Sequence, residues 1–301
     1  MPNPQFPIKK SFKGLFVGLV TLDLIYLAES PPQNNQKLVA EDYIVAAGGP
    51  VTNASVTFSH LGNNAKVLGV VGSHPMTQLI KSDLANYQVE IIDCYPTTEN
   101  PPPVSSIIVS KDSGERAVIS INAVKNQVNS KDISPDILQD IDIVLIDGHQ
   151  MALGCAIAQK AKAENIPVVI DGGSWKPGFD KLLPFVDYAI CSANFYPPNC
   201  HNSQEVFTYL NQIGIPNIAI TQGENPIQYL CQSEIKVLDV PKIQPADTLG
   251  AGDIFHGAFC HYILQETFTT ALEAAAKIAA LSCQSFGSRR WMENQETAIT
   301  D

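Results

Sequence analysis

The chain has 301 residues, of which 45% are hydrophobic, so it can bury a large core as one large domain or two smaller ones. Its formal net charge of -11 and pI of about 4.9 argue against nucleic acid or an anionic membrane as partners. No stretch reaches the roughly 18 uninterrupted apolar residues that a membrane helix requires. The seven cysteines form no C-x-x-C pair and no metal-ligand cluster, which predicts buried thiols in a reducing cytoplasm.

The beginning of the chain predicts a loose arm followed by a buried strand. Residues 1–12 contain three prolines and show no periodicity. The apolar run Leu15 to Leu22 predicts a strand that delivers Asp23 at its carboxyl end, where open parallel sheets bind ligands; a plain strand end is the alternative. Because the run is short and Asp23 interrupts it, we expect a cytoplasmic protein and not an exported one.

Two segments predict a small sheet that stands off the main domain. Residues 25–45 alternate apolar and polar side chains around Pro31 and Pro32, and residues 104–122 are rich in β-branched residues with a turn at 111–114. Neither segment has helices to cover both of its faces, so we expect a small antiparallel sheet. Arg116 would lie on this sheet, either reaching a ligand or standing in solvent.

A helix is predicted from Val51 to Leu61, directly after Gly48 and Gly49. Paired glycines give the backbone the freedom of a hinge. Asn53, in the first turn, offers a donor and an acceptor to a polyol, although an N-terminal capping role is the alternative.

From residue 65 onward, short apolar runs alternate with helical segments, as a parallel α/β sheet demands. Strands are predicted at 66–71, 141–146, 168–170, 188–191 and 217–221, and helices at 155–164, 205–213 and 271–282. Polar residues follow several strands and would gather at one edge of the sheet. They occur at 147–149, 171–175, 192–194 and 221–224.

The stretch from Pro245 to Phe259 predicts a phosphoryl-transfer site. Gly250, Ala251 and Gly252 let successive backbone N–H groups converge where a helix begins, and helix N-termini attract phosphate. Asp253 stands where a base for a kinase reaction would have to be. The alternative is an Asp cap on an ordinary core helix.

Two of these motifs resemble the signatures of the ribokinase-like, or phosphofructokinase B, family of carbohydrate kinases. Asp247-Thr-Leu-Gly-Ala-Gly-Asp253 is similar to the C-terminal signature, and Gly48-Gly-Pro-Val-Thr-Asn53 to the N-terminal one. The resemblance extends over nearly the whole chain. It implies one domain over residues 1–301, an α/β fold with a doubly wound, mostly parallel sheet and helices on both faces. Residues 25–47 and 101–122 would form a β-sheet lid.

The resemblance also implies a role for individual residues. Asp253 would be the catalytic base, with Gly250, Ala251 and Gly252 as the anion hole. The sugar would contact Asp23, Gly48, Gly49, Asn53, Arg116, Asp147 and His149, the last two being similar to ketohexokinase-like kinases. The nucleotide would contact Asn194, Thr221, Gly223, Glu224, Gly252 and Ala276. A monovalent cation, K⁺, would be bound at Asp247, Leu249, Ser282, Ser285 and Gly287.

Two positions depart from the family pattern. Pro50 stands where the family often carries Lys after the paired glycines, which is a hint against ribokinase itself. Asn194-Phe-Tyr-Pro197 lacks the Glu of the Asn-x-x-Glu motif, which orders Mg²⁺ through water. Mg²⁺ would then arrive on the ATP phosphates, with Glu224 as a guess for the substitute.

The predicted function is ATP-dependent phosphorylation of a sugar hydroxyl, with ATP and Mg²⁺ as cofactors and K⁺ as a candidate. The expected partners are a small sugar and ATP, with no nucleic acid and no membrane, and a homodimer through the lid is a further candidate. One alternative is a nucleoside kinase, for which Tyr26, Tyr43 and Ile108 would supply part of an aromatic or apolar platform. Another is a catalytically silent sugar or nucleotide sensor.

Overall fold

The computed structural model describes residues 11–121, 127–129 and 133–295 of the chain. Most of the arm expected over residues 1–12 lies outside these ranges, as does residue 122 at the end of the second lid segment. Within the described ranges, no helix is long and apolar enough to cross a membrane.

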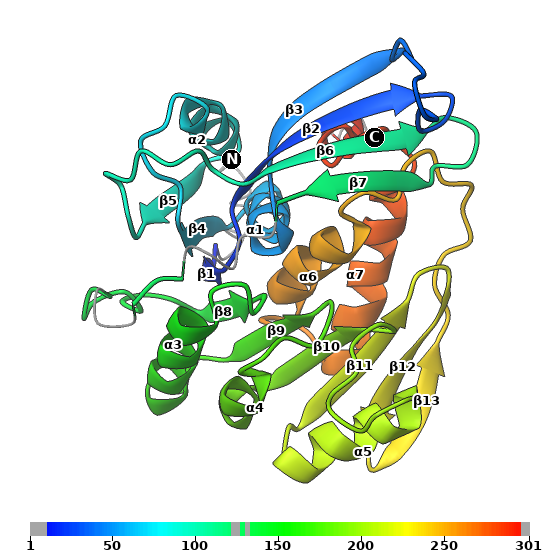
Figure 1. Ribbon diagram of the computed structural model, residues 1–301. Helices are drawn as coiled ribbons and strands as arrows, with labels where there is room; N and C mark the ends of the chain where they lie inside the picture. The colour runs from blue at the N-terminus through cyan, green and yellow to red at the C-terminus, as the bar shows by residue number, and fades with distance from the viewer. Residues whose placement is uncertain (1–10, 122–126, 130–132, 296–301) are drawn as a thin grey trace, which may run out of the picture.

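A large sheet forms the body of the protein (Figure 1). Among the described residues it has nine strands in the order β13-β12-β11-β10-β9-β8-β1-β4-β5. Every pair from β5 to β11 is parallel, whereas β12 and β13 extend the β11 edge as antiparallel strands. The strands are β1 (Lys13–Val17), β4 (Asn64–Gly69), β5 (Val89–Asp93), β8 (Ile143–Ile146), β9 (Val168–Gly172), β10 (Tyr188–Ser192), β11 (Asn217–Gln222), β12 (Asn225–Cys231) and β13 (Glu234–Leu238).

Helices cover both faces of this sheet, which confirms the predicted doubly wound fold. On one face, α1 (Pro50–His60), α2 (Thr77–Asn86), α6 (Ala251–Tyr262) and α7 (Phe268–Ser282) share a core with Phe16. On the other, α3 (Met151–Ala163), α4 (Phe179–Leu182) and α5 (Ser203–Ile213) share a core with Leu15. These two neighbours in β1 enter opposite cores because side chains alternate across a strand. Short 3₁₀ helices span Leu183–Phe185 and Arg290–Gln295.

The second sheet is small and stands off the large one, as predicted (Figure 1). It contains β2 (Thr21–Ala28), β3 (Asp42–Gly48), β6 (Val104–Ser110) and β7 (Arg116–Ser120), in the order β3-β2-β6-β7. The outer pairs are antiparallel, but the central pair β2–β6 is parallel, so the sheet is mixed and not antiparallel throughout. Its inner face, carrying Ile25 and Ile107, packs on Phe286 near the C-terminus.

The run Leu15 to Leu22, predicted as one strand, is divided between the two sheets. The chain leaves the large sheet after β1 at Gly18, which lies against the buried Asp147 carboxylate. A Cβ at Gly18 would lie 2.0 Å from Oδ1 of Asp147, and Oδ2 accepts the Leu19 amide at 2.9 Å. The prediction that Asp23 ends the first strand of the large sheet is therefore wrong, because Asp23 lies inside β2. The run is apolar throughout because both strands are buried, so the hydrophobic pattern shows no boundary.

The other predicted elements are confirmed, with bounds that shift by a few residues. The helix expected from Val51 is α1, and those expected at 155–164, 205–213 and 271–282 are α3, α5 and α7. The five strands expected from residue 66 onward are β4, β8, β9, β10 and β11. The sequence analysis did not predict α2, β5 or the edge strands β12 and β13. Edge strands are covered on fewer sides, which weakens their hydrophobic signal.

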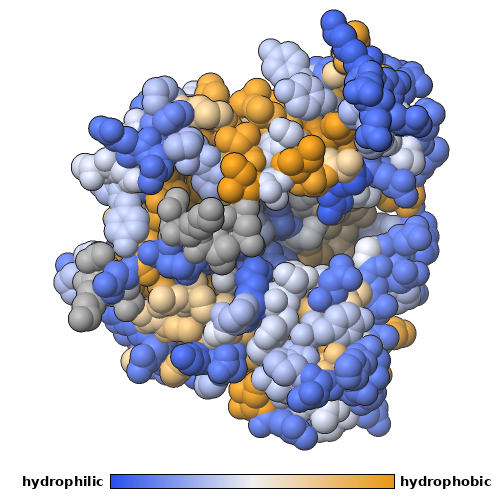
Figure 2. All heavy atoms as spheres, viewed as in Figure 1, coloured by the Kyte–Doolittle hydropathy of each residue, from blue (hydrophilic) through white to orange (hydrophobic). Residues whose placement is uncertain are grey.

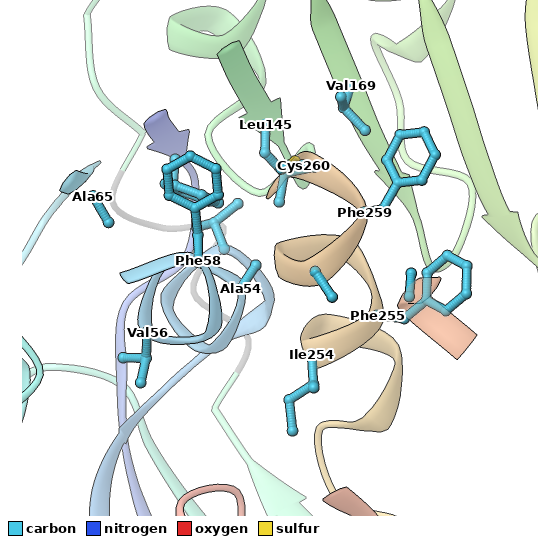
Figure 3. Close-up of a cluster of buried hydrophobic side chains, with 14 of the residues drawn as sticks. Ala54, Val56, Phe58, Ala65, Leu145, Val169, Ile254, Phe255, Phe259 and Cys260 are labelled. Atoms are coloured by element: carbon cyan, nitrogen blue, oxygen red, sulfur yellow. The ribbon is translucent and has the colours of Figure 1, made fainter. Parts of the chain in front are cut away.

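Helices α1 and α6 approach each other closely at Gly257. A Cβ on Gly257 would lie 2.2 Å from the carbonyl oxygen of Ala54 and 2.8 Å from Cβ of Thr57. Figure 3 shows Ala54 on the side of α1 that faces α6. The missing side chain at Gly257 therefore sets the separation of the two helices, and this separation decides how near their first turns lie.

We predict that Gly257→Ala lowers the free energy of unfolding by about 1–3 kcal/mol, because the added methyl overlaps backbone that cannot move aside cheaply. Gly252→Ala, in the same helix, is the matched control. A Cβ there meets no heavy atom of another element within 4 Å, and Ala is the better helix former by up to about 1 kcal/mol. Urea unfolding of both variants is the measurement. Wild-type stability of Gly257→Ala would show that this contact does not set the helix separation.

Candidate active site

Asp253 and Asn53 meet across the first turns of α6 and α1. The Nδ2 of Asn53 donates a hydrogen bond of 2.8 Å to Oδ2 of Asp253. The N-cap positions of the two helices are Gly250 (φ 72°) and Gly49 (φ 101°), which have no side chains to cap with. Neither Asn53 nor Asp253 is thus the capping residue of its helix. The side chains of Asn53 and Asp253 instead face each other, at the position where the sequence predicts the phosphoryl-transfer site.

The surroundings raise the pKa of Asp253 to about 7. Burial is the largest cause, and the negative charge of Asp171 adds to it. The hydrogen bond from Asn53 and the charge of His256 act in the opposite direction, whereas Asp23 raises the pKa further. A carboxyl group with a pKa near neutrality is suited to general acid–base catalysis.

His256 and Asp171 join α6 to the strands beneath it. The Nδ1 of His256 lies 2.7 Å from the carbonyl oxygen of Gly252 and 3.7 Å from Oδ2 of Asp171. Its Nε2 lies 3.2 Å from the carbonyl oxygen of Ile190 in β10. The sequence analysis placed Asp171 among the polar strand ends without giving it a role, and it did not consider His256.

The first turn of α6 can receive an anion. Gly252 is exposed, and Gly250 adopts a positive φ of 72°, which favours glycine. The first N–H groups of a helix lack intrahelical partners, and the Ala251 amide makes only a long contact of 3.4 Å with the carbonyl of Thr248. The positive end of the helix dipole lies at the same turn. Gly250, Ala251 and Gly252 therefore have the free N–H groups and the local positive potential that a phosphate site needs.

Asp23 lies on the inner face of the small sheet and is 7% exposed. Its Oδ1 accepts a hydrogen bond of 2.8 Å from Oγ1 of Thr21. Burial raises the pKa of Asp23, and hydrogen bonds from Thr21 and Ser105 act against this. Gly48, in the neighbouring strand, leaves the space for the carboxylate, because a Cβ there would lie 2.0 Å from Oδ2 of Asp23. Gly48 thus has a steric role that the hinge interpretation did not include.

Arg116 connects the small sheet to the loop before α6. Its Nη1 donates to Oγ1 of Thr248 at 3.0 Å and to the Thr248 carbonyl at 3.3 Å. Oγ1 of Thr248 in turn donates to the carbonyl of Gly114 at 3.4 Å. The guanidinium group, although exposed, therefore lies beside the turn expected to hold phosphate.

Asp247 joins the two loops expected to bind a monovalent cation. Its Oδ1 accepts the Leu249 amide and its Oδ2 the Gly287 amide, both at 2.8 Å. Burial raises the pKa of Asp247. Ser282 ends α7 and Ser285 follows it in the second loop. Within the described part of the chain, no group of three or more His, Cys, Asp or Glu side chains could hold a metal ion, so backbone carbonyls would have to supply most ligands of a cation here.

Asp147 stabilises the turn between the two sheets. It is 1% exposed, and its Oδ1 accepts the His149 amide at 2.8 Å and lies 3.3 Å from Nδ1 of His149. Burial by itself would raise the pKa of Asp147, but the charge and hydrogen bond of His149, with the amides of Leu19 and His149, lower it overall. The side chain of His149 is 25% exposed and is the more accessible member of the pair.

The positions expected to bind the nucleotide lie mostly where β10 and β11 end. Asn194, Gly223 and Glu224 are exposed, as a ligand-binding edge of an open α/β sheet requires. Thr221 donates to the carbonyl of Cys191 at 3.3 Å. Ala276, in contrast, is a buried core residue of α7.

The sequence analysis missed Arg289, which is 5% exposed and contacts Asn53. Arginine is almost never fully buried unless it is paired, so composition alone predicts a surface position. The residues around it show no periodic pattern, and its partners come from elements more than 200 positions earlier in the chain.

Comparisons with known proteins agree with this geometry. A sequence model described as "pfkB family carbohydrate kinase" matches residues 13–295. Ribokinase of Bacillus subtilis (strain 168) is 21% identical over 290 residues, covering 92% of this chain and 94% of that protein. The structure of Arabidopsis thaliana ribokinase complexed with ribose and ATP gives a TM-score of 0.76 at 20% identity, covering 97% and 100% of the two chains. Ribokinase from Giardia lamblia gives 0.77 at 16% identity, covering 96% and 100%.

The raised pKa of Asp253 predicts a pH-dependent effect of Asp253→Asn on stability. A carboxyl whose pKa is higher in the folded than in the unfolded chain makes the fold less stable as pH rises through the interval between the two values. That interval runs from 3.8 to about 7. Asp253→Asn should therefore raise the free energy of unfolding by about 1–3 kcal/mol at pH 8 and by clearly less at pH 5. Urea unfolding at both pH values measures this, and a variant less stable than the wild type at pH 8 would contradict it.

Proposed function

This chain belongs to the pfkB family of carbohydrate kinases, and we propose that it transfers the γ-phosphoryl group of ATP to a hydroxyl of a small sugar, with Asp253 as the base. The proposal rests on one observation: a partly buried carboxylate with a raised pKa lies in the first turn of a helix whose N-terminus is open. Phosphoryl transfer to an alcohol needs both a base for the hydroxyl and a seat for the phosphates.

In the proposed reaction the sugar oxygen attacks the γ-phosphorus, its proton passes to the carboxylate of Asp253, and ADP leaves. The backbone N–H groups of Gly250, Ala251 and Gly252, with the positive end of the α6 dipole, stabilise the charge on the phosphates. Asn53 holds the carboxylate through its 2.8 Å hydrogen bond. Because a loose transition state leaves little covalent work to the protein, positioning and electrostatics would supply most of the rate.

The sugar would be held between the small sheet and α1. Asp23 and Asn53 offer oxygens and an amide to its hydroxyls, and Gly48 and Gly49 allow close approach. Arg116, Asp147 and His149 are the further candidates. The relatives named above are ribokinases, and one of their structures contains ribose, so ribose is the first sugar to test. The segment Asp147-Gly148-His149, which resembles the ketohexokinase-like kinases, keeps ketoses among the candidates.

The nucleotide would lie along the ends of β10 and β11, at Asn194, Thr221, Gly223 and Glu224, with its phosphates at Gly252 and with Ala276 beneath. Mg²⁺ bound with ATP would neutralise charge on the phosphates. The Glu that follows Asn194 in the family motif is missing here. We propose that the carboxylate of Asp171 takes its place in the outer coordination shell of Mg²⁺. Asp171 is 7% exposed, and its charge acts on Asp253.

K⁺ would bind between the two loops that Asp247 joins, chiefly through backbone carbonyls. The positions proposed for it are Asp247, Leu249, Ser282, Ser285 and Gly287.

The small sheet argues for a sugar and against a nucleoside. Tyr26 pairs with Tyr43 and Ile108, three positions along the strand from Asp23. Because side chains alternate across a strand, these three residues lie on the face opposite Asp23 and cannot form a platform for a base beside it. The silent-sensor alternative gains no support from the site, since Asp253 and the glycine-rich turn are both in place.

We further propose that the small sheet, as the lid formed by residues 25–47 and 101–122, covers the sugar with its inner face and contacts a second copy with its outer face. The outer face exposes Tyr43 by 65% and Ile119 by 76%, together with Tyr26 and Val45. Figure 2 shows apolar side chains gathered over this sheet. Such patches mark protein interfaces, and a homodimer is the occupant we propose.

The proposed function is tested by ATP turnover across a panel of pentoses, ketoses, aldoses and nucleosides. We expect a sugar to be the best acceptor, and Asp253→Asn to lower kcat for it by roughly 100-fold or more while ATP still binds, because the amide cannot accept the proton. If no sugar is phosphorylated, or the variant keeps near wild-type turnover, the proposal fails.

Gly48→Ala tests the placement of the sugar. The added methyl would displace the Asp23 carboxylate, so the KM for the sugar should rise by about 10-fold or more. The KM for ATP serves as the internal control and should stay unchanged. Equal changes in both constants would indicate a general distortion of the site, and no change would remove Asp23 from sugar binding.

A further inference from the structure

Arg289 lies at the centre of a buried polar network behind the proposed catalytic base. Its Nη1 donates to Oδ1 of Asn53 at 2.9 Å, and its Nη2 donates to the carbonyl of Ala47 at 2.7 Å. Nη2 also lies 3.4 Å from Oδ2 of Asp83, an oxygen that accepts the Ala47 amide at 2.9 Å. The guanidinium group stands 5.4 Å from the centre of the Tyr87 ring. One side chain thus connects α1, α2 and the end of β3.

The chemistry of these groups leaves Asn53 one orientation. Arginine can only donate hydrogen bonds, so the amide oxygen of Asn53 must face Arg289. The NH₂ group of Asn53 then faces Asp253, whose ionised carboxylate can only accept. A flipped amide would set oxygen against carboxylate on one side and NH₂ against guanidinium on the other.

We propose that Arg289 is a positioning residue for phosphoryl transfer, which fixes the amide of Asn53 so that it donates to Asp253 and keeps this base ionised. The proposal rests on the function proposed above for Asp253. It assigns to Arg289 no contact with sugar or nucleotide, since all the partners named here are protein groups.

The charges around Asp253 make this hydrogen bond important. Asp171 from β9 and Asp23 from β2 raise the pKa of Asp253, in addition to burial, whereas Asn53 from α1 and His256 from α6 lower it. If the Asn53 amide turned, Asp253 would lose one of its two stabilising partners and gain a facing oxygen. The charge of Arg289 also lowers the pKa of Asp23, so its loss would favour protonation of a second carboxylate in the site.

The main test is the pH dependence of kcat/KM in Arg289→Met, with Arg290→Met as the matched control. Arg290 is the next residue, but its guanidinium is half-exposed and pairs with Asp42 at 2.6 Å, away from Asn53. Arg289→Met should move the acid limb to higher pH by about one unit, so that activity falls several-fold at pH 6.5 to 7 and recovers towards pH 9. Arg290→Met should keep the wild-type profile.

A purely structural role for Arg289 would give a different result. It would lower stability, or lower activity equally at every pH, and leave the acid limb of the folded enzyme at its wild-type position. That outcome would overturn the proposal.

Because Arg289→Met leaves Asp83 without its cation, a second variant keeps the proposal testable if this one does not fold. Arg289→Lys retains the charge, but a single ammonium group cannot hold Asn53, Ala47 and Asp83 in the same geometry, so a smaller shift in the same direction is expected. In an Asn53→Ala background, where the amide is absent, Arg289→Lys should cause no further shift. A wild-type acid limb in Arg289→Lys, or an undiminished shift in the double variant, would contradict the proposal.

The carboxyl ¹³C signal of Asp253, followed by NMR in the ligand-free protein, separates this inference from the proposed function. Wild-type enzyme that phosphorylates no sugar would defeat the proposed function, yet the titration would still show whether Arg289→Lys raises the pKa of Asp253. If the titration is unchanged by the substitution, the role of Arg289 fails, whatever the activity.

Discussion

The site depends on the close parallel packing of α1 and α6. Because Gly257 has no side chain, α6 approaches the Ala54 carbonyl of α1. This contact brings the first turns of the two helices together. Nδ2 of Asn53 therefore lies 2.8 Å from Oδ2 of Asp253, although 200 positions separate the two residues in the chain. An extra methyl group between the helices would move Asp253 relative to Asn53, and if Asp253 is the base, even a small misplacement would be costly to the reaction.

In the proposed function, an acidic protein must bind an anionic substrate, ATP. The chain has a net charge of -11, and the charges of Asp23 and Asp171 act on Asp253. The compensating positive potential is local: the open N-terminus of α6, the charge of His256 and the buried guanidinium of Arg289. Burial and the charge of Asp171 raise the pKa of Asp253 to about 7 against the effects of Asn53 and His256. A base with such a pKa would be neither permanently protonated nor too weak near neutral pH.

The fold and half of this arrangement follow from local sequence, and the rest does not. The helix starts that carry Asn53 and Asp253 were predictable because glycines mark the turns before these helices, and the family resemblance is confirmed. The roles of the two residues stay predictions. The placement of Asp23 was not predictable, because the run from 15 to 22 is apolar across two strands of different sheets. The burial of Arg289 could not be predicted from the sequence, because its partners come from α1 and β3 and only the tertiary fold brings them together.

The role of Asp253 as the base can be tested with an experimental structure of the wild-type protein bound to a non-hydrolysable ATP analogue and to ribose or the best sugar of the panel. If Asp253 is the base, the hydroxyl facing the terminal phosphate should lie about 2.6–3.2 Å from the Asp253 carboxylate, with that phosphate at the first turn of α6. A hydroxyl that instead faces Asp171 or Asp147, with Asp253 contacting no substrate atom, would contradict this role.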